Sequence, residues 1–399
     1  MARAVAVVGS GQTKYKSSYS ELSQPELVKH AVRLALEDAH LQISDIDAVI
    51  YSMAPDALAG VLHAERWVSD GAGAIAGKPF IRINTGGASG LSAVQAAYDH
   101  VASGVYDTVL VCGAERTGES GDAQSILNRI WDPMYERAMP LNTITMLAMQ
   151  AVCFFEKYGA IEEDMARVSV KSHANGMHNK FAHVQQRLTL EDVLRSRMVS
   201  YPIKLYDSCP VSSGAAAVIL ANAAKVHRST DRPAWITGLS ASTETYWIGD
   251  RTGPKALANH ADSPALAEAI RAAYKMAGIG SKDIQVAELY APFSNIELHA
   301  IPEAGFCAAE DVCTRLRDGY FNMDGQIPIN PSGGVLCANP IAVTAMVRGI
   351  EAALQVMGKA EGHQIPNVRH AIATGIGGDH QFFASMVFSA EPRASDDKS

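Results

Sequence analysis

The sequence contains no long hydrophobic run and no pair of cysteines at metal-ligand spacing. No apolar stretch reaches the length of about 20 residues that a transmembrane helix needs. The six cysteines are scattered without a CxxC motif, which argues against a zinc site and a disulfide framework and favours a reducing compartment. The first residues, "MARAVAVVGSGQTKY", lead directly into a predicted strand. We therefore expect no signal peptide and a cytoplasmic protein.

Positively charged residues are also fewer than negatively charged ones. The 399 residues include 34 Lys and Arg against 42 Asp and Glu, and no basic block stands out from this balance. A net charge of −8 argues against nucleic acid or an anionic membrane surface as a partner. With 48% hydrophobic residues, the chain can form two domains or one large duplicated domain with an ample core.

A nucleophile is absent where many α/β enzymes place one. The stretch "INTGGASGLSAVQAAYDHVASG" (83–104) predicts a strand, a tight turn and an amphipathic helix, but Gly86 and Gly87 occupy the turn. Such a turn directs backbone N–H groups and the positive end of the helix dipole at a bound oxyanion or enolate. The alternative is a tight turn with no ligand. The earlier "VVGSGQT" lacks the third glycine of a dinucleotide-binding fingerprint.

The chain repeats itself. Residues 28–52 and 266–290 both predict a helix, a short turn and a strand, and the first helix opens with a capping box at Ser23 and Glu26. A further helix-strand unit follows each of them, and this recurrence favours a duplication. The two segments carry identical residues at a constant offset. Those of the first segment are Ala31, Arg33, Ala35, Ala39, Asp45 and Ile46, and they align with Ala269, Arg271, Ala273, Ala277, Asp283 and Ile284 of the second.

The alternation of strands and helices predicts an α/β fold with a parallel-rich sheet covered on both faces. We expect a first half at 1–116 and 207–230, interrupted by a mostly helical insertion at 117–206. The second half covers 231–391, and 392–399 forms a disordered tail.

Three further segments have the character of the first glycine turn. "ELYAPFSNIELHA" (288–300) predicts a strand end that runs into a helix, where Tyr290, Asn295 and Glu297 would approach an active site. "NPSGGVLCANPIAVTA" (330–345) places Asn339 at the start of a helix, and "TGIGGDHQFF" (374–383) places Gly378 after a strand. Each turn alone is explained by packing, but four of them in one duplicated chain favour a shared site.

These segments, together with "YDSCPVSSGAAAVILA", resemble the thiolase superfamily nearly end to end, nearest to the thiolases related to sterol carrier protein 2. The resemblance implies a five-layered α-β-α-β-α sandwich with a loop domain inserted in the first half. It also implies a dimer that binds coenzyme A thioesters.

The sequence departs from the family at its reactive positions. Gly87 stands where the family carries its nucleophilic Cys, and Asn339 stands in place of the His that activates it. The family's second reactive Cys aligns with Gly375, and another active-site His aligns with Tyr290. An acyl-enzyme needs a thiolate, and Cys337, close to Asn339, is the one candidate left to supply it.

The first hypothesis is a retro-aldol cleavage of a β-hydroxyacyl-CoA without an acyl-cysteine. Tyr290, which resembles the tyrosine of thiolase-like aldolases in steroid side-chain degradation, is the acid–base candidate and needs a lowered pKa to act as a base. Asn339 and the backbone of Gly86, Gly87 and Gly378 would hold the enolate oxygen.

Two alternatives stay open. A Claisen-type exchange on a 3-oxoacyl-CoA could proceed by direct attack of coenzyme A or through Cys337, with Asp379 and His380 as acid–base groups. A non-catalytic acyl-CoA-binding subunit would bind coenzyme A without turnover.

Coenzyme A is expected as part of the substrate, and no tightly bound cofactor is expected. The segment "VSVKSHANGMHNKFAHVQQR" (168–187) resembles the family's loop domain. The resemblance also suggests a homodimer and a small partner subunit with a zinc ribbon and an OB fold. The residues proposed to contact coenzyme A and its phosphates are Lys171, Asn175, Asn179, Lys180, Arg187, Arg195 and Arg197.

Overall fold

A nine-stranded sheet runs through the computed structural model, which describes residues 3–75, 77–252 and 260–393. The strand order is β3-β2-β4-β7-β1-β8-β11-β10-β9. Most of the tail predicted at 392–399 lies outside the described residues. The strands of this sheet are β1 (Val5–Gln12), β2 (Ala48–Ser52), β3 (Phe80–Ile83), β4 (Thr108–Arg116), β7 (Ser213–Asn222), β8 (Ala234–Thr243), β9 (Val286–Glu288), β10 (His370–Gly377) and β11 (Phe382–Ser389).

The two ends of this sheet mirror each other. Reading outward from the centre, β1-β7-β4-β2 corresponds to β8-β11-β10-β9, and the two groups meet where Ala6 and Val7 pair with Trp235 and Ala234. The predicted predominance of parallel pairs is wrong, because within the described residues of this sheet only β2/β3, β2/β4 and β9/β10 run parallel. A short turn joins β10 directly to β11, and such a connection reverses the chain.

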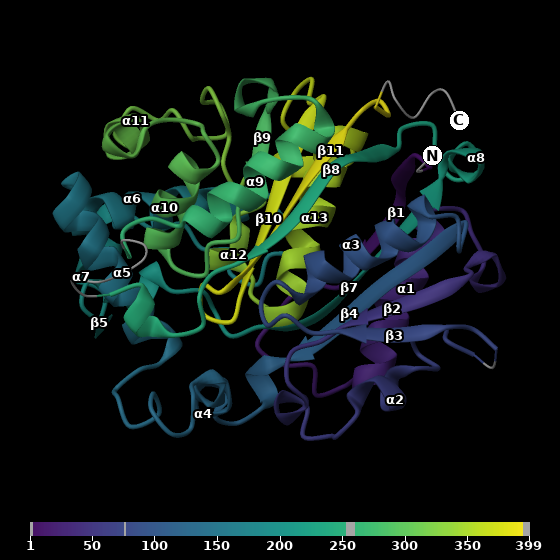
Figure 1. The fold of residues 1–399 in the computed structure, drawn as a ribbon, viewed down its shortest axis with the longest axis horizontal. Helices are drawn as coiled ribbons and strands as arrows, with labels where there is room; N and C mark the ends of the chain where they lie inside the picture. The colour runs from purple at the N-terminus through teal and green to yellow at the C-terminus, as the bar shows by residue number, and fades with distance from the viewer. Residues whose placement is uncertain (1–2, 76, 253–259, 394–399) are drawn as a thin grey trace.

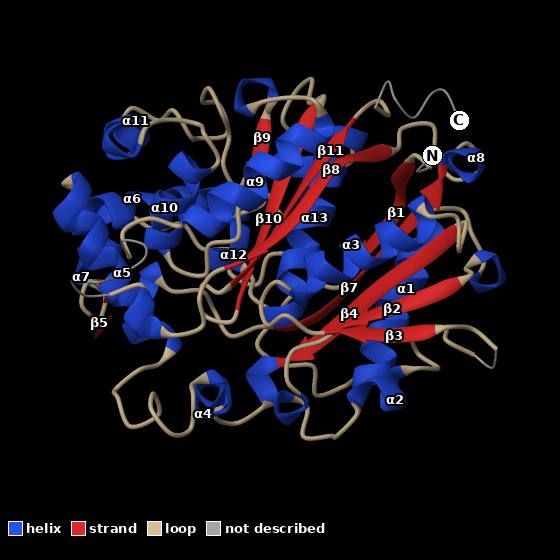
Figure 2. Cartoon of the chain, viewed as in Figure 1, coloured by secondary structure: helices blue, strands red, loops and turns tan. Residues whose placement is uncertain are grey.

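Helices cover both faces of both strand groups (Figure 1, Figure 2). Helices α1 and α9 lie on the outside, whereas α3 and α13 pack against each other between the strand groups. The result is the expected five-layered α/β sandwich. The helices are α1 (Gln24–Asp38), α2 (Ala64–Val68), α3 (Ser89–Ala102), α4 (Ala123–Leu127), α5 (Thr143–Tyr158), α6 (Glu162–Gly176), α7 (Leu190–Arg195), α8 (Ala223–Val226), α9 (Pro264–Ala277), α10 (Ser294–Glu303), α11 (Val312–Arg317), α12 (Gly334–Cys337) and α13 (Ile341–Met357).

Close helix packing explains the glycines of "VVGSGQT". A Cβ added at Gly9 would lie 2.6 Å from the Cβ of Ala39, and one added at Gly11 would lie 2.6 Å from the amide nitrogen of Ala35, both at or beside α1. Gly238 on β8 meets α9 in the same way, with Ala277 as its neighbour. These glycines therefore allow close contact between a strand and a helix in each half, and they form no nucleotide site.

The segment between β4 and β7 carries α4 to α7 and a short ribbon of β5 (Met198–Ser200) and β6 (Ile203–Lys204). Helix α6 packs against α10 and α12, which belong to the second half of the sequence. The insertion and domain boundaries drawn from the sequence stay a prediction. Among the described residues, no helix combines the length and the apolarity that crossing a bilayer requires.

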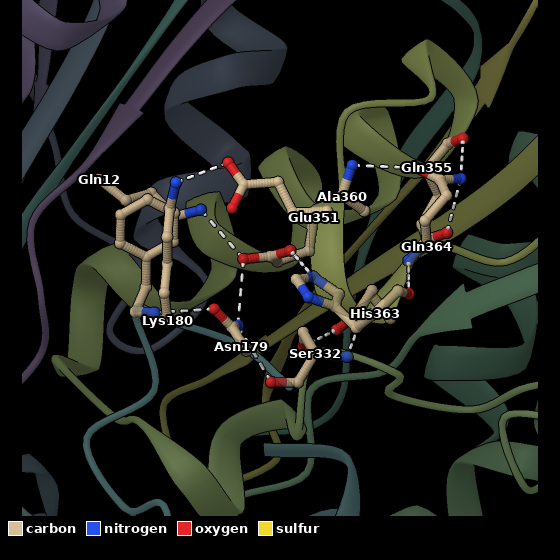
Figure 3. Close-up of polar contacts among 12 residues, drawn as sticks. Gln12, Asn179, Lys180, Ser332, Glu351, Gln355, Ala360, His363 and Gln364 are labelled. Atoms are coloured by element: carbon tan, nitrogen blue, oxygen red, sulfur yellow. Dashed lines mark hydrogen bonds and ion pairs between the residues drawn. The ribbon is translucent and has the colours of Figure 1, made fainter. Parts of the chain in front are cut away.

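A buried polar network joins distant parts of the chain around Glu351 of α13 (Figure 3). Its carboxylate accepts hydrogen bonds from Gln12 at 3.0 Å and Asn179 at 3.4 Å, and it pairs with the Nε2 of His363 at 2.7 Å. Asn179 also donates to the carbonyl oxygen of Ser332 at 3.0 Å. The network therefore links β1, the segment after α6 and the third glycine turn.

The ion pair between Glu351 and His363 makes stability depend on pH. Burial opposes both charges, but the pair holds the pKa of Glu351 below and that of His363 above their ordinary values. The Glu351 contribution is present above about pH 4.3 and is lost as the pH falls further, whereas the His363 contribution is complete below about pH 6.5 and is lost as the pH rises through its raised pKa.

We expect His363→Gln to lower the free energy of unfolding by about 3 kcal/mol near pH 6, because it leaves a buried carboxylate unpaired. The loss should shrink as the pH is raised from 6 toward 9, because the wild-type histidine loses its own charge as the pH passes its raised pKa. Urea unfolding of both proteins across this range checks the expectation. An equal loss at pH 6 and pH 9 would show that the pair is not charged.

Candidate active site

A cavity of about 290 Å³ opens beside the glycine turns. Of the eight predicted catalytic residues, seven line it and Cys337 does not. The seven come from the ends of β9 and β10, the turn before α3 and the start of α13. The predicted residues that the structure brings together are Gly86, Gly87, Tyr290, Asn339, Gly378, Asp379 and His380.

Two of the glycine turns interlock at the floor of the cavity. Gly86 has φ +63° and Gly378 has φ +59°, a region of backbone space that favours glycine. A Cβ added at Gly86 would lie 2.8 Å from the amide nitrogen of Gly378, so the two backbones touch with no room for side chains. Helix α3 starts directly after this turn, and its N-cap residue, Ala88, provides no side-chain cap. The floor is therefore built of backbone at the positive end of a helix.

The hydroxyl of Tyr290 fills the space that a side chain at Gly87 would need. A Cβ added there would lie 2.5 Å from the Tyr290 hydroxyl oxygen and 2.5 Å from the carbonyl oxygen of Ile376. The absence of a side chain at Gly87 and the position of Tyr290 therefore depend on each other, because a nucleophilic side chain and the tyrosine hydroxyl would occupy the same space. A Cβ at Gly375 would instead face Ala345 and the start of α3, and Gly375 does not line the cavity.

Tyr290 is 4% exposed, and its hydroxyl makes no hydrogen bond within the described part of the chain. Burial raises the pKa of Tyr290 above its ordinary value, and the nearby Cys209 adds to the rise. The lowered pKa that a resting tyrosine base needs is not found. The hydroxyl is protonated at neutral pH and free to donate a hydrogen bond into the cavity.

Asn339 is held from three sides. Its backbone N–H donates to the hydroxyl of Ser212 at 3.0 Å, and its side-chain oxygen accepts from the hydroxyl of Thr344 at 2.9 Å. Its Nδ2 donates to the sulfur of Cys209 at 3.0 Å. The amide N–H group therefore points toward the cavity wall that Cys209 forms.

Two cysteines differ from their expected places. Cys209, which is not among the predicted catalytic residues, lines the cavity. Cys337 is fully buried on α12, and its thiol donates to the carbonyl oxygen of Ser172 in α6 at 3.3 Å. Burial raises the pKa of Cys337 to about 12. The likeness of "YDSCPVSSGAAA" to thiolase sequences locates Cys209, but nothing in the sequence indicates that its side chain reaches the cavity.

His380 and Asp379 lie at the opposite end of the same turn. The Nε2 of His380 contacts the hydroxyl of Ser263 at 2.9 Å, and burial lowers the pKa of the imidazole well below its ordinary value. Burial likewise raises the pKa of Asp379, whose carboxyl oxygens have no hydrogen-bond partner among the described residues. Arg251 donates to the backbone carbonyls of both residues and fixes the turn.

None of the seven residues proposed to contact coenzyme A lines this cavity. Lys171, Asn175 and Arg187 border a separate cavity of about 600 Å³ near α6 and α11. Lys171 is buried in an ion pair with Glu297 at 2.9 Å, and Asn175 donates to the carbonyl oxygen of Asn330 at 3.0 Å.

The other predicted residues make internal or surface contacts. Asn179 belongs to the network around Glu351, while Lys180 and Arg195 form exposed ion pairs with Glu361 and Glu191. Arg197 is exposed. Asn295 and Glu297, expected near the active site, do not line the cavity. Asn295 donates to the carbonyl oxygen of Leu147.

Comparison with known proteins agrees with this geometry. The model for "Thiolase, N-terminal domain" matches residues 5–224, and "Thiolase C-terminal domain-like" matches 255–390. An acetyl-CoA acetyltransferase of Methanothermobacter thermautotrophicus is 30% identical over 97% of this chain and 100% of its own. A steroid side-chain-cleaving aldolase of Thermomonospora curvata is 30% identical over 84% of this chain and 85% of its own. A solved Ltp2-ChsH2(DUF35) aldolase superposes with a TM-score of 0.81 at 25% identity, covering 97% of this chain and 98% of that one.

Proposed function

Since this chain belongs to the thiolase family, we propose that it is an enzyme that makes or breaks a carbon–carbon bond in an acyl-CoA by aldol chemistry, without an acyl-cysteine. The observation that carries the proposal is the hydroxyl of Tyr290 in the space beside Gly87. A thiol at that position would collide with it. The similarity to two aldolases supports the same choice.

The cleavage of a β-hydroxyacyl-CoA balances without a covalent intermediate. The β-hydroxyl gives up its proton as the bond between Cα and Cβ breaks, and Cβ becomes a carbonyl carbon. The bonding electron pair moves into the thioester as an enolate, and a proton then adds to Cα. The products are a ketone or aldehyde and a shorter acyl-CoA.

Tyr290 can serve both proton transfers, because its hydroxyl stands at the floor where the reacting carbons must lie. In the cleavage direction the phenol must first lose its proton: the phenolate takes the proton of the β-hydroxyl, and the phenol so formed gives it to the enolate carbon. The resting, protonated form suits the reverse direction, in which it donates to the new alkoxide. The amide of Asn339 and the backbone turn of Gly86 and Gly87 stabilise the enolate oxygen.

The lining of the cavity selects the acyl group. Among the described residues, no Lys or Arg borders the cavity, and its wall is mainly apolar. Ile144 and Leu147 come from α5, Phe293 from the turn before α10, and Ile376 from the end of β10. A carboxylate there would lose its hydration without a counter-charge. The acyl group is therefore apolar, and the phosphates of coenzyme A lie outside the cavity.

One observation favours the Claisen-type alternative. Cys209 lines the cavity beside Tyr290 and Asn339, so a thiol is present in the site even though the expected one is absent. The similarity to an acetyl-CoA acetyltransferase points the same way. Burial raises the pKa of this thiol to about 11, which disfavours the thiolate that acyl transfer needs.

Turnover with matched substrates separates the two reactions. The purified enzyme is given apolar β-hydroxyacyl-CoAs alone, and the corresponding 3-oxoacyl-CoAs together with coenzyme A, and the products are identified by mass spectrometry. We expect a carbonyl compound and a shorter acyl-CoA from the first set alone. Consumption of the 3-oxoacyl-CoAs with coenzyme A would favour the alternative.

The assembly also belongs to the proposal. Within the described residues, strand β3 ends the sheet and pairs on one side only, and Ile81 on this edge is 43% exposed. An edge strand of this kind is a template for pairing with a second chain, so we infer a homodimer across β3. The similar aldolase is described together with ChsH2(DUF35), which supports a second, small subunit for this chain as well.

A further inference from the structure

We propose that Thr344 is a positioning residue that fixes the direction of the Asn339 amide, and that Cys209 marks the place of a substrate oxygen. In the free enzyme, the side-chain N–H of Asn339 donates a hydrogen bond to the sulfur of Cys209. During the reaction, the same N–H donates to the thioester oxygen of the substrate instead. The assignment of the substrate oxygen rests on the proposed function, whereas the direction of the amide does not.

Thr344 is fully buried on α13 and does not line the cavity, so it cannot touch a substrate. Its hydroxyl donates to the side-chain oxygen of Asn339 at 2.9 Å. Since the oxygen is held on the Thr344 side, the NH₂ group is left on the opposite side, where it meets the sulfur of Cys209 at 3.0 Å. The backbone N–H of Asn339 is anchored separately on Ser212, which prevents the whole residue from turning.

An enolate oxygen is stabilised only by hydrogen-bond donors, so the direction of this amide decides whether the site works. A flipped Asn339 would present its oxygen to the enolate and repel it. The hydroxyl of Thr344 donates to the amide oxygen in the observed orientation, and in the flipped orientation it would have to turn and accept from Nδ2. The reaction therefore also constrains Thr344, which lies in the core on α13 and outside the cavity.

Cys209 reports on the orientation without any substrate. Burial raises the pKa of its thiol, and the N–H of Asn339 acts against that rise by stabilising the thiolate. If the amide turns, its oxygen faces the sulfur and the thiolate becomes less stable. Alkylation of Cys209 proceeds through the thiolate, so its rate at a given pH follows the direction of the amide.

The test compares Thr344→Val with Thr344→Ser. N-ethylmaleimide is added across a range of pH, and peptide mapping gives the alkylation rate of Cys209. Thr344→Val should slow alkylation roughly threefold or more at each pH, equivalent to about half a unit in pKa. It should also lower kcat about tenfold with little change in KM. Thr344→Ser keeps the hydroxyl and should match the wild type in both readouts.

A matched control is Thr237→Val, which removes a buried hydroxyl bonded to Ser389 at 2.7 Å, remote from the cavity. It should change neither readout. An unchanged alkylation profile in Thr344→Val, or a change shared by Thr344→Ser, would overturn the role of Thr344. If Thr344→Val slows alkylation but the wild type cleaves no β-hydroxyacyl-CoA, the orientation stands and the aldol function falls.

Discussion

Replacing Tyr290 with phenylalanine should abolish carbon–carbon bond cleavage and leave acyl-CoA binding intact. The change removes one oxygen that has no hydrogen-bond partner within the described part of the chain, so the fold should survive. The loss of a positioned acid–base group lowers kcat by a factor on the order of 10² to 10⁴. Turnover of a β-hydroxyacyl-CoA and calorimetric binding of a non-reactive S-alkyl-CoA measure the two effects separately.

The pH dependence of the wild type gives this prediction a second readout. The pKa of Tyr290 is raised by burial, so less than about one molecule in a thousand carries a phenolate at pH 7. If the phenolate takes the hydroxyl proton, kcat for cleavage rises about tenfold per pH unit throughout the neutral range. Any residual activity of Tyr290→Phe should lack this slope. A flat profile in the wild type would contradict the assignment.

Adding a side chain at Gly87 should damage both the fold and the reaction. In Gly87→Ala, the new Cβ lies 2.5 Å from the Tyr290 hydroxyl and from the carbonyl oxygen of Ile376, and the backbone of β10 cannot yield easily. We expect a loss of about 2 kcal/mol in the free energy of unfolding, with activity reduced in parallel. Gly87→Cys should be no better, because its thiol would compete with the phenol for the same space.

The control for this prediction is Gly280→Ala. A Cβ added at Gly280 meets only a carboxyl oxygen of Asp283 at 3.9 Å, and the residue does not line the cavity. It should unfold and react like the wild type. If Gly87→Cys folds well and gains 3-oxoacyl-CoA thiolysis, the cavity tolerates a thiol and the link between Gly87 and Tyr290 is wrong.

The duplicated α/β architecture was accessible from the sequence because it depends on local periodicity, whereas the five layers were expected from the resemblance to thiolases. The matched segments 28–39 and 266–277 carry small residues at corresponding positions, and these are the residues that contact Gly9 and Gly238. The direction of strand pairing was not accessible, since it depends on the return of β7 and β11 to their neighbours. The clustering of Gly86, Tyr290 and Asn339 followed from placing each at the end of a strand or the start of a helix.

The cysteines and cations show where sequence reasoning ends. Cys337 and Asn339 are two residues apart, yet Cys337 is buried against α6 and Asn339 lines the cavity. Lys171 looks available for a phosphate in the sequence, but Glu297, more than a hundred residues away, pairs with it in the core. Such contacts depend on which side of its helix or strand a side chain points from and on what packs against that side in the folded protein. The spacing of residues along the sequence alone does not determine either.

The central claim, carbon–carbon bond chemistry without an acyl-enzyme, is tested most directly by a single turnover read in two ways. The enzyme is mixed with an equimolar β-hydroxyacyl-CoA, quenched at intervals, and analysed by mass spectrometry for both small products and intact protein. We predict that the carbonyl product and the shorter acyl-CoA appear while the protein mass never changes, in the wild type and in Cys209→Ala and Cys337→Ala alike. A transient acyl adduct on the wild-type protein that disappears in Cys209→Ala would contradict the account and identify a thiolase whose thiol has moved.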